Sequence, residues 1–388
     1  MFSERTRFDL RPNRLAAALA ARRACGAPLV DLTLSNPTRA GLPAVPDLLA
    51  GLASPDALFY EPVPLGLARA REAVARDFAS RGAALDPDRI LLHASTSEAY
   101  GFLFKLLCDP GDEVLVPRPG YPLFDFLAGL ESVRVASYPL GYDGEWHLDA
   151  AAVAAAASPR TRAVIVVSPG NPTGAYLKRS ELEALEALCA ERGIALIADE
   201  VFADFAFGED PRRVATVARD SWALAFALGG LSKSCGLPQL KLAWTAVVGP
   251  EPLRREALAR LEVVADTYLP VSTPVQVAAA GLLERKSQLA APIRERVASN
   301  LGRLRRALAH GSPATLVEPE GGWSAILRVP ATCSEEERAL RLLERHGVLV
   351  HPGYFFDFPG EAYLVLSLLP PGDAFAEGVA RVLSDLVL

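Results

Sequence analysis

Short apolar runs alternate with helix-length segments through the middle of the chain. Four of these runs are rich in Ile, Leu and Val: ILLH (90–93), EVLV (113–116), AVIVVS (163–168) and IALIAD (194–199). Runs of this length and composition predict buried strands. The segments between them are long enough for helices, and strands separated by helices form βαβ units. We therefore predict a mainly parallel sheet that is covered on both faces.

The C-terminal part of the chain has a different pattern. From about residue 251 the sequence predicts helices as far as His310, and a second block of strands and helices follows. At 388 residues the chain exceeds one ordinary hydrophobic core, so two domains of unequal size are expected. We predict an α/β fold with a three-layer large domain (residues 45–285) and a smaller α/β domain (residues 286–388). Residues 1–44 are expected to form an N-terminal arm and part of the small domain.

Composition limits the partners and the compartment. Forty Lys and Arg residues against 46 Asp and Glu residues give a net charge of -6, which argues against a nucleic-acid or anionic-membrane partner. The five cysteines and five histidines are scattered without a metal-ligand spacing, so neither a disulfide framework nor a metal site is expected. The apolar run LAAALAA near the N-terminus is too short for a signal peptide or a membrane span. We expect a cytoplasmic protein.

Candidate chemistry begins in the segment GGLSKSCGLPQLKLAW (229–244), which contains Lys233. The apolar run 222–228 before it predicts a buried strand, so Lys233 is expected on a Gly- and Ser-rich loop at the end of that strand. Ligand sites of open α/β sheets gather at such loops. Burial lowers the pKa of a lysine, and the neutral amine can form a Schiff base. An ordinary surface lysine on a turn is the commoner explanation of the segment alone.

Polar residues follow other predicted strands as well. The segment STS (95–97) opens a helix whose free N–H groups can bind a phosphate, although a simple N-cap is the alternative. Asp199 ends an apolar strand and needs a cationic partner such as a protonated ring nitrogen, unless it only caps the next turn. Asn171 in GNPTG can donate to a ring oxygen or form an Asx turn. Tyr121 in PGYP can stack on a flat ligand or simply pack.

These motifs occur together in a recognisable order. The segments YEPVPLG, STSEAY, DPGDEVLVPRPGYP, SPGNPTG, ADEVF, LSKSCGLPQLKLAW, EGGW and GVLVHPG run over nearly the whole chain. In this order and at similar intervals they resemble the class I/II aminotransferases, aspartate aminotransferase-like enzymes of fold type I that depend on pyridoxal 5'-phosphate (PLP). Each motif is weak alone, but unrelated motifs would not fall in this sequence by chance. The resemblance implies PLP as the cofactor and a PLP-dependent transferase-like fold.

The resemblance also implies roles for individual residues. Lys233 matches the lysine that forms a Schiff base with PLP and then moves the proton. Asp199 matches the carboxylate on the ring nitrogen, Asn171 matches the donor to the ring hydroxyl, and Tyr121 matches the stacking aromatic residue. The positions that match the phosphate site are Thr96, Ser97, Ser232 and Lys241. Tyr60 matches a tyrosine that reaches the phosphate of the neighbouring subunit, which implies a homodimer.

Several positions depart from the pattern of the family, among them Gly230, where a phosphate-binding serine is common, and Ser95, where a glycine is. Phe202 stands where a tyrosine usually binds the ring hydroxyl, so Asn171 is left as the main donor. Lys241 replaces an arginine and can meet the phosphate only as a point charge. Val365 in YLVLS stands where the family has an arginine that binds the carboxylate of the substrate through two hydrogen bonds.

Two explanations of Val365 stay open. Another residue may supply the carboxylate contact, with Asn36, Arg39 and Arg328 as candidates; alternatively, the substrate has no carboxylate there or loses it. The expected substrate contacts are Ser35, Asn36, Arg39 and Trp323. The aromatic residues after HPG suggest an apolar wall together with Trp323, although such groups more often form core (Tyr354, Phe355, Phe356 and Phe358).

From these features we expect a PLP-dependent aminotransferase that acts on an amino acid or a related amine. The reaction would use a Schiff base on Lys233 and a 1,3-proton transfer, with a 2-oxo acid as the acceptor. The alternatives are another PLP reaction on the same scaffold (C–S or β-lyase, decarboxylase or oxidase) or a PLP-binding protein with degenerate activity. The presence of both Lys233 and Asp199 argues against degeneracy.

Overall fold

An eight-stranded sheet forms the centre of the large lobe of the molecule. The structure, a computed structural model, describes residues 1–43, 45–309, 311–360 and 362–387. The strand order is β2-β9-β8-β7-β6-β3-β4-β5. The strands are β2 (Ile90–His93), β3 (Glu113–Arg118), β4 (Arg134–Tyr142), β5 (Trp146–Leu148), β6 (Thr161–Val167), β7 (Ala195–Asp199), β8 (Ala225–Gly230) and β9 (Ala243–Val248). Only β9 and β5 run antiparallel to their neighbours in this sheet, so the predicted mainly parallel α/β fold is confirmed.

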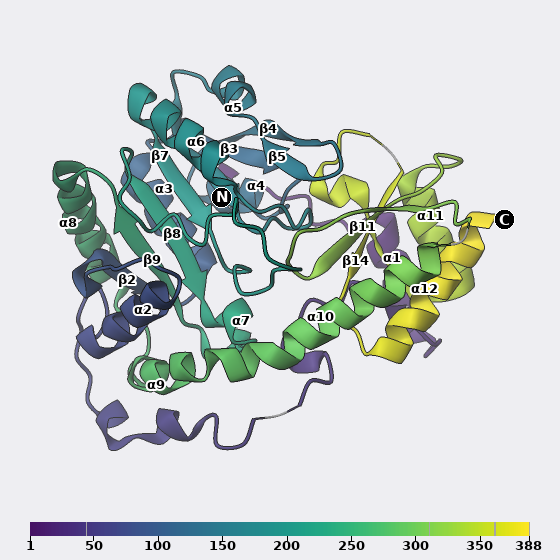
Figure 1. Cartoon of the computed structure of the whole chain (residues 1–388), viewed down its shortest axis with the longest axis horizontal. Coiled ribbons are helices and arrows are strands. Elements are labelled where there is room, and N and C mark those ends of the chain that lie inside the picture. Colours follow the sequence, from purple (N-terminus) through teal and green to yellow (C-terminus); the bar gives the residue numbers. More distant parts are fainter. Residues whose placement is uncertain (44, 310, 361, 388) are drawn as a thin grey trace.

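Helices cover both faces of this sheet (Figure 1). They are α2 (Ala68–Ser80), α3 (Thr96–Leu107), α4 (Phe124–Leu130), α5 (Ala150–Ala156), α6 (Arg179–Arg192), α8 (Glu251–Tyr268) and α9 (Thr273–Glu284). Successive side chains of a strand point to opposite faces, so each strand contributes to two cores. Val164 and Leu196 belong to the cluster under α2, α6 and α9, whereas Ile165 and Ile197 belong to the cluster under α3, α4 and α8. This two-sided burial explains why the strand sequences are almost continuously apolar.

A smaller lobe contains a four-stranded antiparallel sheet in the order β10-β11-β14-β13. Its strands are β10 (Thr315–Val317), β11 (Ser324–Arg328), β13 (His351–Pro352) and β14 (Tyr363–Ser367). The N-terminal strand β1 (Val30–Asp31) pairs with β12 (Val348–Leu349) and so joins this lobe. The helices are α1 (Arg14–Ala24), α10 (Lys286–Leu308), α11 (Glu335–Arg341) and α12 (Gly372–Val387). Figure 1 shows α10 running from the large lobe to the small lobe.

A buried ion network connects the two lobes. Glu320, which precedes β11, pairs with Lys178 at the start of α6 and with Arg213 at 3.1 Å. Lys178 Nζ also donates a hydrogen bond to the carbonyl oxygen of Trp146 at 2.7 Å. Buried ion pairs contribute little net stability, but their geometry is specific and removing one partner leaves an unpaired buried charge. The network therefore fixes the segment from Glu320 to Trp323 against the large lobe.

One expectation about secondary structure is wrong, and another falls on a residue outside the described part of the chain. The run 222–228 is not a strand throughout, because β8 begins at Ala225 and Trp222 is 68% exposed. The hydroxyl of Ser221 donates to the carbonyl of Ala223 at 3.0 Å and accepts from its N–H at 3.3 Å, and this local turn excludes Trp222 from the sheet. His310 lies outside the described residues. Within the described part of the chain, no helix is long and apolar enough to cross a membrane.

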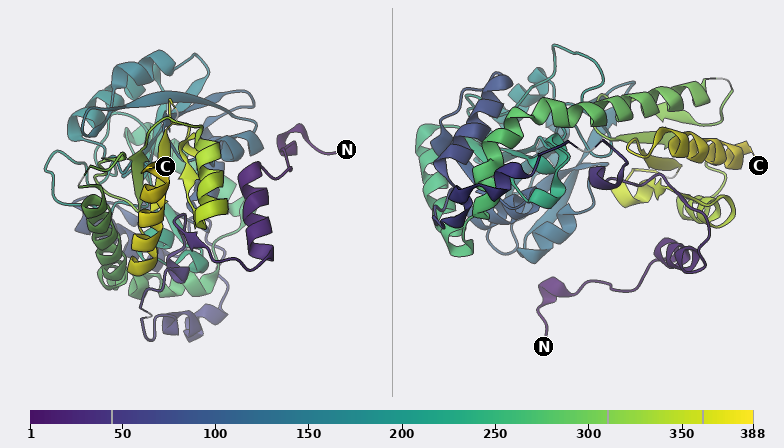
Figure 2. Two further views of the ribbon diagram at one scale, coloured as in Figure 1. Left: turned by 90° about the vertical axis from the view of Figure 1, so that its right-hand side faces the viewer. Right: turned by 90° about the horizontal axis from the view of Figure 1, so that it is seen from below.

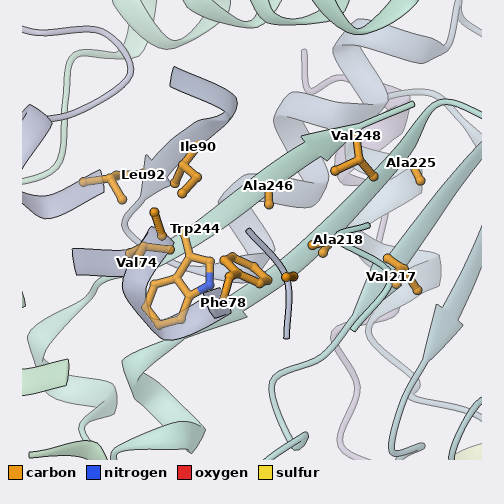
Figure 3. Close-up of a cluster of buried hydrophobic side chains, with 14 of the residues drawn as sticks. Val74, Phe78, Ile90, Leu92, Val217, Ala218, Ala225, Trp244, Ala246 and Val248 are labelled. Atoms are coloured by element: carbon orange, nitrogen blue, oxygen red, sulfur yellow. The ribbon is translucent and has the colours of Figure 1, made fainter. Parts of the chain in front are cut away.

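The buried tryptophan of β9 offers a test of the core. Trp244 is 2% exposed and packs beside Phe78 and Val74 of α2 (Figure 3). Replacing Trp244 by Ala should lower the free energy of unfolding by about 3–5 kcal/mol, because it removes a large buried side chain and leaves a cavity. The matched control Trp222→Ala should change it by less than about 0.5 kcal/mol. Urea unfolding curves measure both values, and equal losses for the two tryptophans would contradict the core assignment.

Candidate active site

Six strands of the large sheet end at one edge, because β2, β3, β4, β6, β7 and β8 all point the same way. The chain segments that leave these ends carry the candidate residues. They are the start of α3 after β2, Tyr121 after β3, Asn171 after β6, Asp199 at the end of β7 and Lys233 after β8. In a parallel sheet such segments share one crevice. The structure therefore brings the polar residues of five separate motifs to the same edge.

Lys233 lies on a single helical turn, α7 (Leu231–Ser234), and not on the irregular loop that we expected. The Leu231 N–H donates to the carbonyl of Leu242 at 3.0 Å, and the Ser234 hydroxyl donates to the carbonyl of Gly230 at 2.9 Å, which closes the turn directly after β8. Burial lowers the pKa of Lys233, and the negative charge of Asp199 partly opposes this effect. A neutral amine is therefore easier to reach here than on an exposed lysine.

Two aromatic side chains enclose the Lys233 amine. Its Nζ lies 5.2 Å from the ring centroid of Trp323 and 5.6 Å from that of Phe202. The two rings meet edge to face with centroids 5.3 Å apart. Phe202 follows β7 in the large lobe and Trp323 precedes β11 in the small lobe, so both lobes contribute to this enclosure. Trp323 is thus the expected substrate contact that the structure places beside Lys233.

Asp199 is a buried carboxylate with two donors from the protein itself. Its Oδ2 accepts a hydrogen bond from the Tyr100 hydroxyl at 3.2 Å, and its Oδ1 accepts one from the Val201 N–H at 3.1 Å. Burial raises the pKa of Asp199 to about 6; the two hydrogen bonds and the charge of Lys233 lower it, and the charge of Glu200 raises it. Asp199 does cap the turn after β7, but its burial also leaves it in need of a positive charge.

Tyr100 is the contact that sequence reasoning missed. In the segment STSEAY it occupies a buried helical position, where an aromatic residue normally indicates core packing. Nothing in the local pattern shows that its hydroxyl reaches a strand that ends 99 residues further along the chain. The pairing of strands places α3 next to the end of β7, so only the tertiary structure reveals this bond.

Asn171 and Tyr121 leave neighbouring strands. Backbone bonds close the Asn171 turn, including the Gly174 N–H to the carbonyl of Gly170 at 2.8 Å, so the amide of Asn171 is not needed for the turn. Asn171 and Gly120 line one cavity, which brings the two exit segments together. Tyr121 is partly exposed, and the charge of Asp199 adds to burial in raising the pKa of its hydroxyl.

The start of α3 offers two N–H groups for an anion. Ser95 is the N-cap, and its hydroxyl accepts from the Glu98 N–H at 3.1 Å, so this serine has a structural role. Thr96 and Ser97 are the first two helical residues, whose N–H groups have no acceptor within a helix. Ser232 is partly buried on α7, whereas Lys241 is exposed with a left-handed backbone (φ 53°) just before β9.

Of the remaining substrate candidates, Asn36 caps a turn and the others are exposed. Asn36 Oδ1 accepts hydrogen bonds from Thr38, from its N–H at 3.0 Å and its hydroxyl at 2.8 Å, so this oxygen caps the turn Pro37–Arg39. Ser35, Arg39 and Arg328 are exposed. The structure therefore shows no built carboxylate clamp at these positions among the described residues.

Val365 lies in an apolar cluster on β14. It is buried against Trp146 of the large lobe and against Ile326 and Phe356 of the small lobe. The aromatic segment after HPG approaches the exit loop of β3, where the Gly120 N–H donates to the carbonyl of Phe356 at 2.9 Å and Arg118 pairs with Asp357. Of this segment Phe356 is core, whereas Tyr354 is exposed.

Comparison with known proteins identifies the family. A model of the family "Aminotransferase class I and II" matches residues 29–368, and the chain belongs to this family. Arginine–pyruvate transaminase AruH of Pseudomonas aeruginosa is 31% identical over 78% of this chain and 75% of its own length. S-alkyl-thiohydroximate lyase SUR1 of Arabidopsis thaliana is 30% identical over 57% of this chain and 48% of its own length. An aminotransferase structure from Escherichia coli, 23% identical, superimposes with a TM-score of 0.88 over 100% of this chain and 98% of its own.

The protein is therefore a PLP-dependent aminotransferase, as the motif order predicted. The residues at the sheet edge fit this cofactor. Asp199 is a buried acceptor in need of a cation, which a protonated pyridine nitrogen supplies, and Lys233 is an amine whose pKa is lowered. The free N–H groups at the start of α3 suit a phosphate. Among the described residues no group of three or more His, Cys, Asp or Glu side chains could hold a metal ion.

The raised pKa of Asp199 predicts how stability depends on pH. Because this pKa is about 6 in the folded protein and 3.8 for an unperturbed carboxyl, the folded state prefers the proton, and the carboxylate costs stability as pH rises from about 4 to 6. The neutral variant Asp199→Asn avoids this cost. Without cofactor, its stability relative to the wild type should rise by roughly 1 kcal/mol between pH 5 and pH 8. Unfolding curves at the two values measure this, and a relative stability that stays constant or falls would contradict the burial argument.

Proposed function

We propose that this aminotransferase moves the amino group of an amino acid or a related amine to a 2-oxo acid, with Lys233 as the residue that binds PLP and moves the proton. The observation that carries this proposal is that the amine of Lys233, whose pKa is lowered by burial, lies at the same sheet edge as the buried carboxylate of Asp199 and feels its charge. PLP supplies an electron sink for the bonds of the substrate α-carbon. As a neutral amine, Lys233 can accept the α-proton and return it to the cofactor side.

The neighbouring residues would hold the cofactor. Asp199 would bind the protonated ring nitrogen, Asn171 would donate to the ring hydroxyl, and Tyr121 would cover the ring face. Phosphate contacts are assigned to Thr96, Ser97, Ser232 and Lys241. Phe202 has no hydroxyl to share, so Asn171 would be the main donor to the ring oxygen. The rings of Phe202 and Trp323 would keep water from the Lys233 amine, which favours its neutral form.

The surroundings of Val365 bear on the choice of substrate. The apolar cluster around Val365 supports an amino donor with no carboxylate at this place, or a carboxylate held elsewhere in the cleft. Since the relative AruH is named for arginine and pyruvate, pyruvate is the first acceptor to test. A lyase is the second candidate, because SUR1 shows that relatives at 30% identity include a protein named as a lyase.

We infer that the working enzyme is a homodimer in which Tyr60 reaches the cofactor phosphate of the partner. Tyr60 is 63% exposed and follows two exposed apolar residues, Leu58 and Phe59. Three adjacent apolar side chains at the surface suit a protein interface. The N-terminal arm also stands away from the body of the molecule, as Figure 2 shows, and it would gain contacts from a second subunit.

We also infer that residues 1–44 and 286–388 act as one domain and residues 45–285 as the other. The hydrophobic cluster that joins Leu15 and Leu32 to Leu301 and Leu342 supports this division. A cytoplasmic location stays a prediction, and the five unpaired cysteines support it.

The catalytic lysine can be tested directly. Lys233→Ala should lose the visible absorbance of bound PLP and at least about a thousandfold of the transamination rate, because no other amine takes its place. The control Lys105→Ala removes an amine that pairs with Glu131, the residue directly after α4, and should retain both. A screen of amino donors with pyruvate follows the conversion of the bound cofactor to its amine form. Ammonia or carbon dioxide as the main product would favour a lyase or a decarboxylase instead.

The dimer has a separate test. Leu58→Asp should convert a particle of twice the 41.4 kDa chain mass to a monomer in light scattering, because it places a charge in an apolar interface. PLP affinity should fall at the same time, since Tyr60 leaves the site of its neighbour. Trp222→Asp, an equally large change at another exposed apolar residue, should leave the mass unchanged. A wild-type monomer at micromolar concentration would refute the dimer.

A further inference from the structure

Tyr100 reaches the active-site carboxylate from a separate element. It lies on α3 and is 3% exposed, and its hydroxyl is 3.2 Å from Asp199 Oδ2. The backbone N–H of Val201 occupies the other oxygen, Oδ1, at 3.1 Å. Each oxygen of the carboxylate therefore receives one donor from the chain. Because a carboxylate oxygen has two lone pairs, both oxygens can still accept another hydrogen bond.

The Tyr100 ring is held in place by aromatic neighbours. Its centroid lies 5.3 Å from that of Phe124 in an edge-on arrangement and 5.9 Å from that of Phe104. Burial, with a contribution from the charge of Asp199, raises the pKa of the Tyr100 hydroxyl well above its usual range. The phenol therefore keeps its proton, and toward an ionised carboxylate it acts only as a donor.

Three ionisable side chains, Glu200, Lys233 and Tyr100, shift the pKa of Asp199. Glu200 disfavours the ionised form by repulsion, and Lys233 favours it by attraction. Burial and, to a lesser degree, the charge of Asp199 raise the pKa of Tyr121, which follows β3. Burial, the largest influence on Asp199, favours its protonated form. The hydroxyl of Tyr100 is thus the side-chain hydrogen bond that opposes this effect.

We propose that Tyr100 is a positioning residue of the cofactor site, whose hydroxyl holds Asp199 ionised and fixed so that it can receive the protonated ring nitrogen of PLP. This inference rests on the proposed role of Asp199 as the partner of that nitrogen. A single ionised acceptor held by two donors from different elements has little freedom to rotate. The cofactor would then meet a carboxylate that is already charged and oriented, which reduces the cost of binding.

The direction of the change in the pKa of Asp199 follows from the loss of the hydrogen bond from Tyr100. A hydrogen bond to the charged form of an acid favours that form, so removing the donor makes the proton bind more tightly. Hydrogen bonds to charged groups are strong enough to move a titration midpoint by about one pH unit. Without the Tyr100 hydroxyl, Asp199 should therefore carry a proton up to a higher pH.

The test compares two buried tyrosines that each lose one hydroxyl. Tyr100→Phe removes the donor to Asp199 and keeps the packed ring. Tyr138→Phe is the matched control: Tyr138 is 1% exposed, and its hydroxyl donates to the backbone carbonyl of Ile165 at 2.7 Å. Thermal unfolding of both variants checks that each remains folded.

The first measurement needs no cofactor. Carbon-13 NMR of protein labelled at the aspartate carboxyl groups follows the titration of Asp199, whose signal is assigned by its loss in Asp199→Asn. The wild-type midpoint should lie near 6, and that of Tyr138→Phe should equal it. In Tyr100→Phe the midpoint should be about one unit higher. Equal midpoints in Tyr100→Phe and the wild type would overturn the proposal.

The second measurement is the dissociation constant of PLP between pH 6 and pH 8.5, followed by its visible absorbance. Tyr100→Phe should bind PLP about fivefold more weakly than the wild type at pH 6 and almost equally at pH 8.5, because only the protonated carboxyl fails to bind. An unchanged ratio across this range, with a shifted NMR midpoint, would refute the positioning role. If the wild type binds no PLP at any pH, the proposed function fails, and the NMR result alone decides whether Tyr100 controls the charge of Asp199.

Discussion

A buried negative charge at the end of a strand sets the conditions for the whole active site. Asp199 is the last residue of β7. Burial favours the protonated form of its carboxyl group and raises its pKa to about 6. The protein opposes this with the Tyr100 hydroxyl and the Val201 N–H, and it places the Lys233 amine near enough to lower the pKa further. The two ionisable groups influence each other, since the charge of Asp199 also raises the pKa of Lys233. In the proposed role, a cofactor with a protonated ring nitrogen would satisfy the carboxylate and leave the amine free to become neutral.

The two lobes have separate tasks around this pair. The large sheet brings the ends of its parallel strands together, and the residues there would hold the cofactor. The small lobe supplies Trp323, whose ring lies 5.2 Å from the Lys233 amine. The ion network of Glu320 with Lys178 and Arg213 anchors the segment that carries Trp323. Although such a network adds little to stability, it fixes the position of the segment that places Trp323 beside the amine.

The departures from the family pattern fall at positions expected to contact both the cofactor and the substrate. Phe202 lacks the hydroxyl of the usual tyrosine, and its ring packs edge to face against Trp323. Val365 joins a core between the lobes with Trp146 and Ile326. A charged arginine placed in this cluster would be buried without a partner, which proteins avoid.

The sequence by itself determined the fold class and the order of the catalytic motifs. Apolar strand runs and helix-length spacers reflect burial on both faces of a sheet, which is a local property that each segment carries on its own. The turn that excludes Trp222 and the helical turn that carries Lys233 depend on hydrogen bonds that the pattern of apolar and polar residues does not encode. Only the tertiary structure placed Tyr100 on Asp199 and Trp323 beside Lys233, because strand order and lobe packing decide which distant residues meet.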